Sequence, residues 1–210
     1  MNQKLEKYIL DHTEAESELL AELSRETQHK VLLPRMLSGH LQGKVLEMIS
    51  KMIRPSYILE LGTYTGYSAI CLAHGLQDNG ILHTIEINDE LESFTKTFIQ
   101  KSGLGGKIKF HIGDAAEIIQ QLPDNIDLVF IDADKRKYLD YYRLVIEKTR
   151  SGGFILADNV LWSGKVVETN NPNDEYTKGI LEFNDFVHQD ERVENVILPI
   201  RDGIMMLRKK

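Results

Sequence analysis

The chain has 210 residues, 42% of them hydrophobic and 27% charged, and its formal net charge is −7. This length supports one hydrophobic core, and the composition is that of a globular protein. The net charge gives no generic footprint for nucleic acid, which leaves a local basic patch as the alternative. Its apolar runs are shorter than the ~18 residues of a transmembrane helix, and the single cysteine, Cys71, excludes an internal disulfide and disfavours a zinc site.

The N-terminal region has the apolar spacing of helices. Apolar residues three and four positions apart predict helices over 8–23 and 41–53, and Pro34 and Gly39 predict a loop over 31–40 between them. The first residues are charged and contain no secretory segment. We therefore expect a cytoplasmic protein of one domain over 1–210, with a helical cap at 1–53 and an α/β core at 56–210.

After Pro55, short aliphatic runs alternate with amphipathic segments, which predicts a parallel sheet with helices on both faces. The expected strands cover 57–62, 81–87, 107–113, 126–133 and 153–159. The expected helices between them cover 68–76, 90–103, 115–122 and 138–149. The fourth and fifth strands are almost continuously apolar, as central strands should be.

The C-terminal segment predicts a helix over 175–191 and then two strands, 193–200 and 203–209. Only Arg201 and Asp202 separate these strands, so they should form an antiparallel hairpin. The expected architecture is an α/β sheet of seven strands, mostly parallel, with this hairpin at one edge.

Acids, amides or glycines follow each of the five parallel strands. In an open α/β sheet, ligands bind beyond the carboxyl ends of the strands. One such strand end is ordinary turn chemistry, but five in succession indicate a binding site. The residues are Glu60, Gly62 and Gly66; Glu86; Gly113, Asp114 and Ala115; Asp132, Asp134 and Lys135; Asp158 and Asn159.

The first two strand ends indicate an adenosine-containing ligand. The turn from Gly62 to Gly66 should offer backbone N–H groups, and Glu86, 20 residues after Gly66, could accept ribose hydroxyls. The glycines are spaced G-x-x-x-G, so the dinucleotide fingerprint is absent, and a helix-entry turn without a ligand is the alternative. Glu60 would repel a pyrophosphate but suits a ligand with a cationic end.

The fourth and fifth strand ends carry hard oxygen ligands. Asp132, Asp158 and Asn159 would suit Mg²⁺ if their strands are neighbours, although each aspartate could instead cap the next element. Lys135 could reach the same site as a base or as a partner of an anionic oxygen. The alternative is a solvated lysine beside Arg136 and Lys137.

Five motifs together resemble a known family: "ELGTYTGYS", "TIEIN", "GDA", "FIDADK" and "LADNVLWSGKV". They are similar to those of the cation-dependent, S-adenosylmethionine (SAM)-using O-methyltransferases, which include catechol and caffeoyl-coenzyme A O-methyltransferases and many bacterial relatives. The match runs from about Met36 to the C-terminus. The resemblance implies a class I methyltransferase fold with a Rossmann-like sheet, and a homodimer.

The resemblance also implies roles for individual residues. SAM would contact Ser38, Glu60, Gly62, Thr63, Tyr64, Gly66, Ser68, Glu86, Asp114, Ala115, Asp132 and Asp134. Glu60 would hold the methionine amino group, Glu86 the ribose and Asp114 the adenine side. Asp132, Asp158 and Asn159 would bind a divalent cation, with Mg²⁺ expected first and Mn²⁺ or Ca²⁺ as alternatives. Lys135 would be the catalytic lysine, assisted by Asp132 and Asn159.

Two acceptors remain open at this level. The first is a small aromatic compound with vicinal hydroxyls, and the second is a hydroxylated uridine of tRNA, which the basic stretch Lys135–Lys137 would favour. The intact set of Asp132, Lys135, Asp158 and Asn159 argues against a third hypothesis, a cofactor-binding module without catalysis. A nicotinamide dehydrogenase disagrees with the missing fingerprint.

The acceptor wall is expected from the N-terminal helices and the 160–176 loop, which includes Asn170, Asn171 and Pro172. Trp162 could stack on an acceptor or simply pack. Leu41 and Lys44 depart from the family's usual residues and should affect the entrance. The tyrosines at 138, 141 and 142 are expected to pack within the helix layer.

Overall fold

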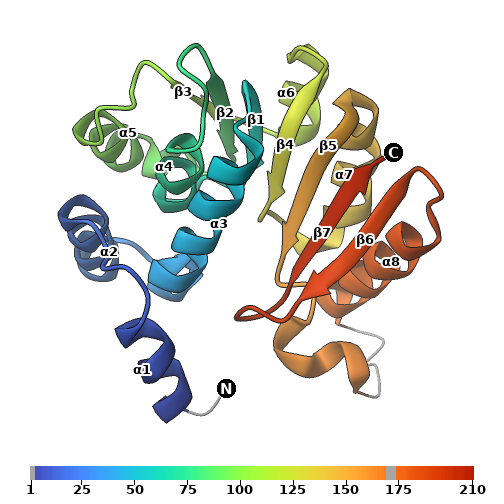
Figure 1. The fold of residues 1–210 in the computed structure, drawn as a ribbon, viewed down its shortest axis with the longest axis horizontal. Coiled ribbons are helices and arrows are strands. Elements are labelled where there is room, and N and C mark those ends of the chain that lie inside the picture. Colours follow the sequence, from blue (N-terminus) through green and yellow to red (C-terminus); the bar gives the residue numbers. More distant parts are fainter. Residues whose placement is uncertain (1–2, 169–173) are drawn as a thin grey trace.

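Seven strands form one sheet in the computed structural model, which describes residues 3–168 and 174–210, and Figure 1 shows them in the order β3-β2-β1-β4-β5-β7-β6. They are β1 (Tyr57–Leu61), β2 (Ile81–Glu86), β3 (Ile108–Ile112), β4 (Ile126–Ile131), β5 (Thr149–Asp158), β6 (Val193–Leu198) and β7 (Ile204–Lys209). The first five are parallel, and β7 runs antiparallel to both β5 and β6. The predicted sheet is confirmed.

Eight α-helices lie in the described residues: α1 (Gln3–Asp11), α2 (Glu18–Lys30), α3 (Gly39–Ile53), α4 (Tyr67–Ala73), α5 (Glu92–Lys101), α6 (Ala115–Gln121), α7 (Tyr138–Lys148) and α8 (Glu175–Gln189). Figure 1 shows α1 projecting from the rest of the molecule. Across residues 3–168 and 174–210, no helix has both the length and the apolar character needed to cross a bilayer. The division into a cap and a core remains a prediction.

The sheet separates two hydrophobic cores. Strand side chains alternate between its faces, so Leu59 and Val129 join the core with α6, α7 and α8, whereas Ile58 and Phe130 join the core with α2, α3, α4 and α5. All residues of β1 and β4 are buried. Their continuous apolar character follows from having helices on both faces.

The predicted helix over 8–23 is wrong in one respect, because the structure divides it into α1 and α2. The Thr13 hydroxyl donates to the Ile9 carbonyl (2.7 Å), and the Ser17 hydroxyl accepts from the Leu20 N–H (3.3 Å). These side chains satisfy backbone groups at the two helix ends, which the apolar spacing does not reveal. The predicted loop also contains a short 3₁₀ turn, η1 (Pro34–Met36).

The strand order reverses between β1 and β4, and this reversal determines where a ligand can bind. Leu61 pairs with Ile131, and Ile131 pairs with Ala157, so β1, β4 and β5 end at one edge of the sheet. The helices that follow β1 and β4 leave toward opposite faces and open a crevice at that edge.

Candidate active site

A cleft of about 1580 Å³ lies at the carboxyl ends of the parallel strands. The predicted site residues on its lining are Ser38, Gly62, Thr63, Tyr64, Ser68, Glu86, Asp114, Ala115, Asp132, Asp134, Lys135, Asp158 and Asn159. Glu60 and Gly66 are not on the lining. The structure thus brings residues from all five strand ends to one cavity.

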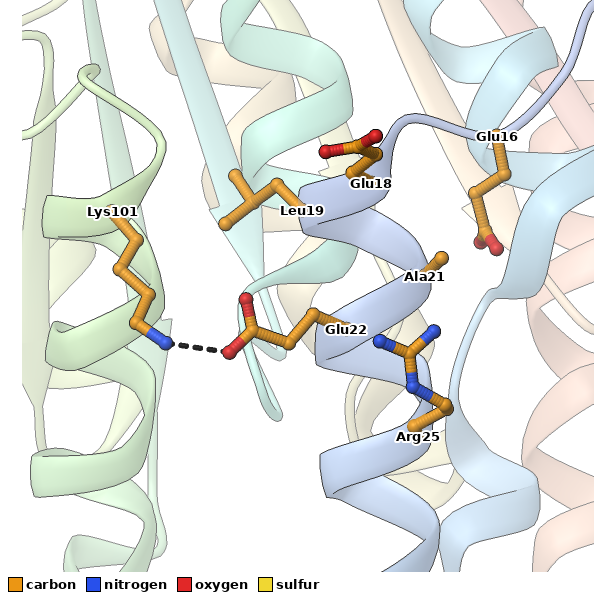
Figure 2. Close-up of a pocket in the computed structure, with 7 residues that line it drawn as sticks. All are labelled: Glu16, Glu18, Leu19, Ala21, Glu22, Arg25 and Lys101. Atoms are coloured by element: carbon orange, nitrogen blue, oxygen red, sulfur yellow. Dashed lines mark hydrogen bonds and ion pairs between the residues drawn. The ribbon is translucent and has the colours of Figure 1, made fainter.

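A second hollow, of about 620 Å³, lies between α2 and α5 (Figure 2). Glu22 of α2 reaches Lys101 of α5 across it, at 2.6 Å. Its lining holds none of the predicted site residues, so the large cleft is the candidate active site.

The glycine turn after β1 allows close contact between two strand ends. Gly62 has φ +95°, and a Cβ atom there would lie 2.0 Å from the carbonyl oxygen of Asp132. Only glycine fits both this backbone conformation and this approach. The Asp132 N–H donates to the Leu61 carbonyl (2.8 Å), which holds the two strand ends together.

Backbone N–H groups hold two acids at the cleft. The carboxylate of Glu86 accepts from the N–H groups of Tyr64 (2.7 Å) and Asn88 (2.9 Å). Asp114 caps α6 by accepting from the Ala116 N–H (2.7 Å), and this bond lowers the pKa of its carboxyl group. These backbone donors fix the direction of both carboxylates at the cleft.

The carboxyl group of Glu60 is fully buried beside the cleft. Its Oε2 accepts from the Thr84 hydroxyl (2.5 Å), whereas its Oε1 has no hydrogen-bond partner within the described residues. Burial raises the pKa of Glu60 to about 8; the hydroxyls of Ser68 and Thr84 oppose this rise, and the carboxylates of Asp132 and Glu86 add to it. Burial therefore favours the protonated form of the Glu60 carboxyl group well above the pH at which an ordinary glutamate ionises.

Asp132, Asp158 and Asn159 lie at the neighbouring ends of β4 and β5, because these two strands pair, which was the condition for their forming one site. Burial and the charge of Asp132 raise the pKa of Asp158 to about 6. A divalent cation would relieve this repulsion, so the donor set fits one. Within the described residues no three His, Cys, Asp or Glu side chains form a metal cluster, so the Asn159 amide oxygen would be needed as a ligand.

Lys135 is buried, and the alternative of a solvated lysine is wrong. Its Nζ donates to Asp132 Oδ1 (2.6 Å) and to the Tyr138 hydroxyl (2.6 Å). That hydroxyl also contacts the carbonyl oxygens of Ile131 (3.2 Å) and Asp158 (3.0 Å). Tyr138 is thus more than a packing residue, and its position three residues after the lysine, on the same helical face, could have indicated this.

Two polar residues near the site, Gln42 and Arg201, were not predicted. Gln42 is 1% exposed, and its Nε2 donates to Asp158 Oδ2 (2.6 Å). Arg201 lines the cleft and donates to Gln42 Oε1 (3.1 Å). Leu41 lines the cleft as expected, but Lys44 does not, because it pairs with carboxylates of α3 and the α1–α2 loop.

Part of the cleft wall is aromatic. Trp162 lines it and stacks on Tyr176, with ring centroids 6.1 Å apart. Tyr141 also lines the cleft, whereas Tyr142 packs in the core and donates to Asp190 (2.9 Å), as expected of a packing residue. Asn170, Asn171 and Pro172 lie outside the described residues.

Comparison with known proteins identifies the family. Residues 10–210 match the model of the O-methyltransferase family. The chain belongs to this family. It is 34% identical to caffeoyl-CoA O-methyltransferase 5 of Nicotiana tabacum, over 98% of this chain and 90% of that protein. The prediction of an O-methyltransferase is confirmed.

Solved O-methyltransferases share the fold over their whole length. TomG from Streptomyces achromogenes, solved in complex with SAM, has a TM-score of 0.92 and 25% identity, covering 100% of this chain and 99% of that one. The Bacillus cereus O-methyltransferase, solved in complex with SAH, has a TM-score of 0.91 and 28% identity, covering 99% and 97%. The donor predicted for this chain is the ligand of the first structure.

Proposed function

We propose that this O-methyltransferase transfers the SAM methyl group to one of two adjacent hydroxyls of a small aromatic acceptor, with a divalent cation, Mg²⁺ first, at Asp132, Asp158 and Asn159. The observation that carries the proposal is the convergence of these three residues and Lys135 at one end of a cleft. The glycine turn and Glu86 line the same cleft.

SAM would occupy the β1–β2–β3 side of the cleft. Glu86, already oriented by two backbone N–H groups, would accept the ribose hydroxyls, and the Asp114–Ala115 segment would border the adenine. Ser38 and Ser68 would contact the methionine carboxylate. The unpartnered, buried Oε1 of Glu60 is the observation that fits a cationic amino group.

Residues of this chain would prepare the acceptor for methyl transfer. A phenol with a pKa near ~10 is a weak nucleophile at neutral pH. A divalent cation, when bound, would lower the pKa of the acceptor hydroxyl and fix its orientation. Lys135, held by Asp132 and Tyr138, would accept or stabilise the departing proton. The cleft would hold the acceptor oxygen in line with the sulfonium methyl group.

The ion pairs of the basic stretch Lys135–Lys137 favour a small acceptor over tRNA. The basic stretch that supported tRNA is neutralised residue by residue: Lys135 bonds Asp132, Arg136 pairs with Asp134 (2.6 Å), and Lys137 pairs with Asp114 (3.3 Å). Few cations there remain available for phosphate contacts. The homodimer and the cytoplasmic location remain predictions from the sequence.

The test is methyl transfer from labelled SAM to a panel of catechols, with Mg²⁺ and then with EDTA. Asp158→Ala is compared with wild type and with Asp140→Ala, an exposed acid of α7 that serves as the matched control. The proposal is supported if EDTA abolishes the wild-type activity, Asp158→Ala has no activity, and Asp140→Ala keeps the activity of wild type. Activity that survives both would refute the metal assignment, and methylation of hypomodified tRNA without any catechol turnover would refute the acceptor class.

A further inference from the structure

We propose that Arg201, acting through Gln42, is a positioning residue for Asp158 as a cation ligand. This inference rests on the proposed function, because it assigns a task within the cation site. It adds two residues that are distant from Asp158 in the sequence and belong to other elements, α3 and the β6–β7 turn.

The chain of contacts fixes the orientation of a buried amide. Arg201 Nη1 donates to Gln42 Oε1 (3.1 Å), and Gln42 Nε2 donates to Asp158 Oδ2 (2.6 Å). A guanidinium can only donate, so it selects the amide orientation that presents the NH₂ group to the carboxylate. Without Arg201, the amide could rotate and place its oxygen against Asp158.

Asp158 is held by two donors, one on each oxygen. Oδ1 accepts from the Asn159 N–H (2.8 Å) and Oδ2 from Gln42. Each oxygen keeps a further lone pair for a cation, so the two donors set the plane of the carboxylate without blocking it. Outer partners of this kind orient metal ligands, and their loss typically costs about 10–100-fold in metal affinity.

The position of Arg201 is itself tightly determined. Its φ of 50° lies in the left-handed region, which is unfavourable for a residue with a Cβ. Its guanidinium also donates to the carbonyl oxygens of Leu37 (3.2 Å) and Ser38. No carboxylate within the described residues pairs with it, so its hydrogen bonds to the entrance loop and to Gln42 are what hold it.

The experiment measures Mn²⁺ binding to the full chain by calorimetry, without SAM. Arg201→Met and Gln42→Met should each weaken binding roughly 10–100-fold, and Arg201→Lys should restore part of the affinity. The double variant should bind no more weakly than the weaker single variant, because both changes break one chain of contacts. Arg208→Met, an exposed arginine on β7, is the matched control and should bind like wild type.

Unchanged Mn²⁺ affinity in folded Arg201→Met would overturn the inference. The inference would also fail if the losses of affinity in the two single variants add fully in the double variant, because independent structural effects of the two residues would be additive. If Gln42→Met fails to fold, the Mn²⁺ affinities of Arg201→Met and Arg201→Lys are sufficient to test the role of Arg201. Wild type that binds no Mn²⁺ would overturn the cation site itself. Wild-type binding that Asp158→Ala abolishes and Arg201→Met leaves intact would overturn only the role of Arg201.

Discussion

Glu60 gives the sharpest prediction, because its buried carboxyl group has one oxygen without a partner within the described residues. Burial raises its pKa from the ordinary 4.5 to about 8. Between these values the folded chain binds more protons than the unfolded chain, so the contribution of Glu60 to stability is lost as the pH rises through this window. The full slope is about 1.36 kcal/mol per pH unit and it levels off above pH 8, so the loss from pH 6 to pH 9 is roughly 3 kcal/mol.

The perturbation is Glu60→Gln, which keeps the shape of the side chain and removes its titration. Urea unfolding at pH 6, 7, 8 and 9, with EDTA and at one ionic strength, gives the free energy of unfolding of both proteins. Relative to the variant, wild type should lose roughly 3 kcal/mol over this range. Glu117→Gln changes an exposed acid of α6 and should follow wild type.

Parallel stability curves for wild type and Glu60→Gln would refute the reasoning, because they would mean that Glu60 is already ionised and partnered in the folded chain. A second measurement examines the proposed donor. If the SAM amino group pairs with Glu60, binding at pH 7 should release close to one proton from wild type and none from the variant. Calorimetry in buffers of different ionisation enthalpy measures this release.

Three further predictions concern Lys135, Gly62 and the pair His83 and His111. Lys135→Met should lower kcat roughly 10²–10⁴-fold without weakening Mn²⁺ binding; a loss below tenfold in steady-state kinetics would contradict its role. Gly62→Ala should lower the melting temperature sharply, because its Cβ would lie 2.0 Å from the Asp132 carbonyl oxygen; a wild-type melting curve would refute that contact. Burial lowers the pKa of both His83 and His111, so stability should fall below pH 6.5, and replacing both with phenylalanine should flatten the urea midpoints between pH 5 and 7.

The sequence predicts much of the sheet and of the site for the same physical reason. Aliphatic runs bounded by glycine, proline or acids predict each strand, and parallel strands place their carboxyl ends along one edge. That is why Glu86, Asp114, Asp132 and Asp158 could be placed at one edge of the sheet from the strands that they follow. The assignment needed no knowledge of how the helices pack.

The contacts that sequence reasoning missed depend on packing between distant elements. In the sequence, nothing distinguishes Gln42 from the other polar residues of an amphipathic helix. Its contact with Asp158 exists only because α3 lies against the end of β5. The sequence left Lys135 open between the cation site and a solvated surface lysine, because Arg136 and Lys137 follow it directly. The 3₁₀ turn η3 (Lys135–Lys137) places Lys135 in the interior and leaves the next two cations at the surface.

The position of β7 between β5 and β6 has a consequence for how the sheet is assembled during synthesis. Because β7 follows β6 in the chain yet pairs directly with β5, the strand that ends at Asp158 keeps an unpaired edge while α8 and β6 are being made. Unpaired strand edges promote association between nascent chains. This edge of β5 closes only after β7 (Ile204–Lys209) has been made and pairs with it, so the last segment of the chain completes the sheet beside Asp158.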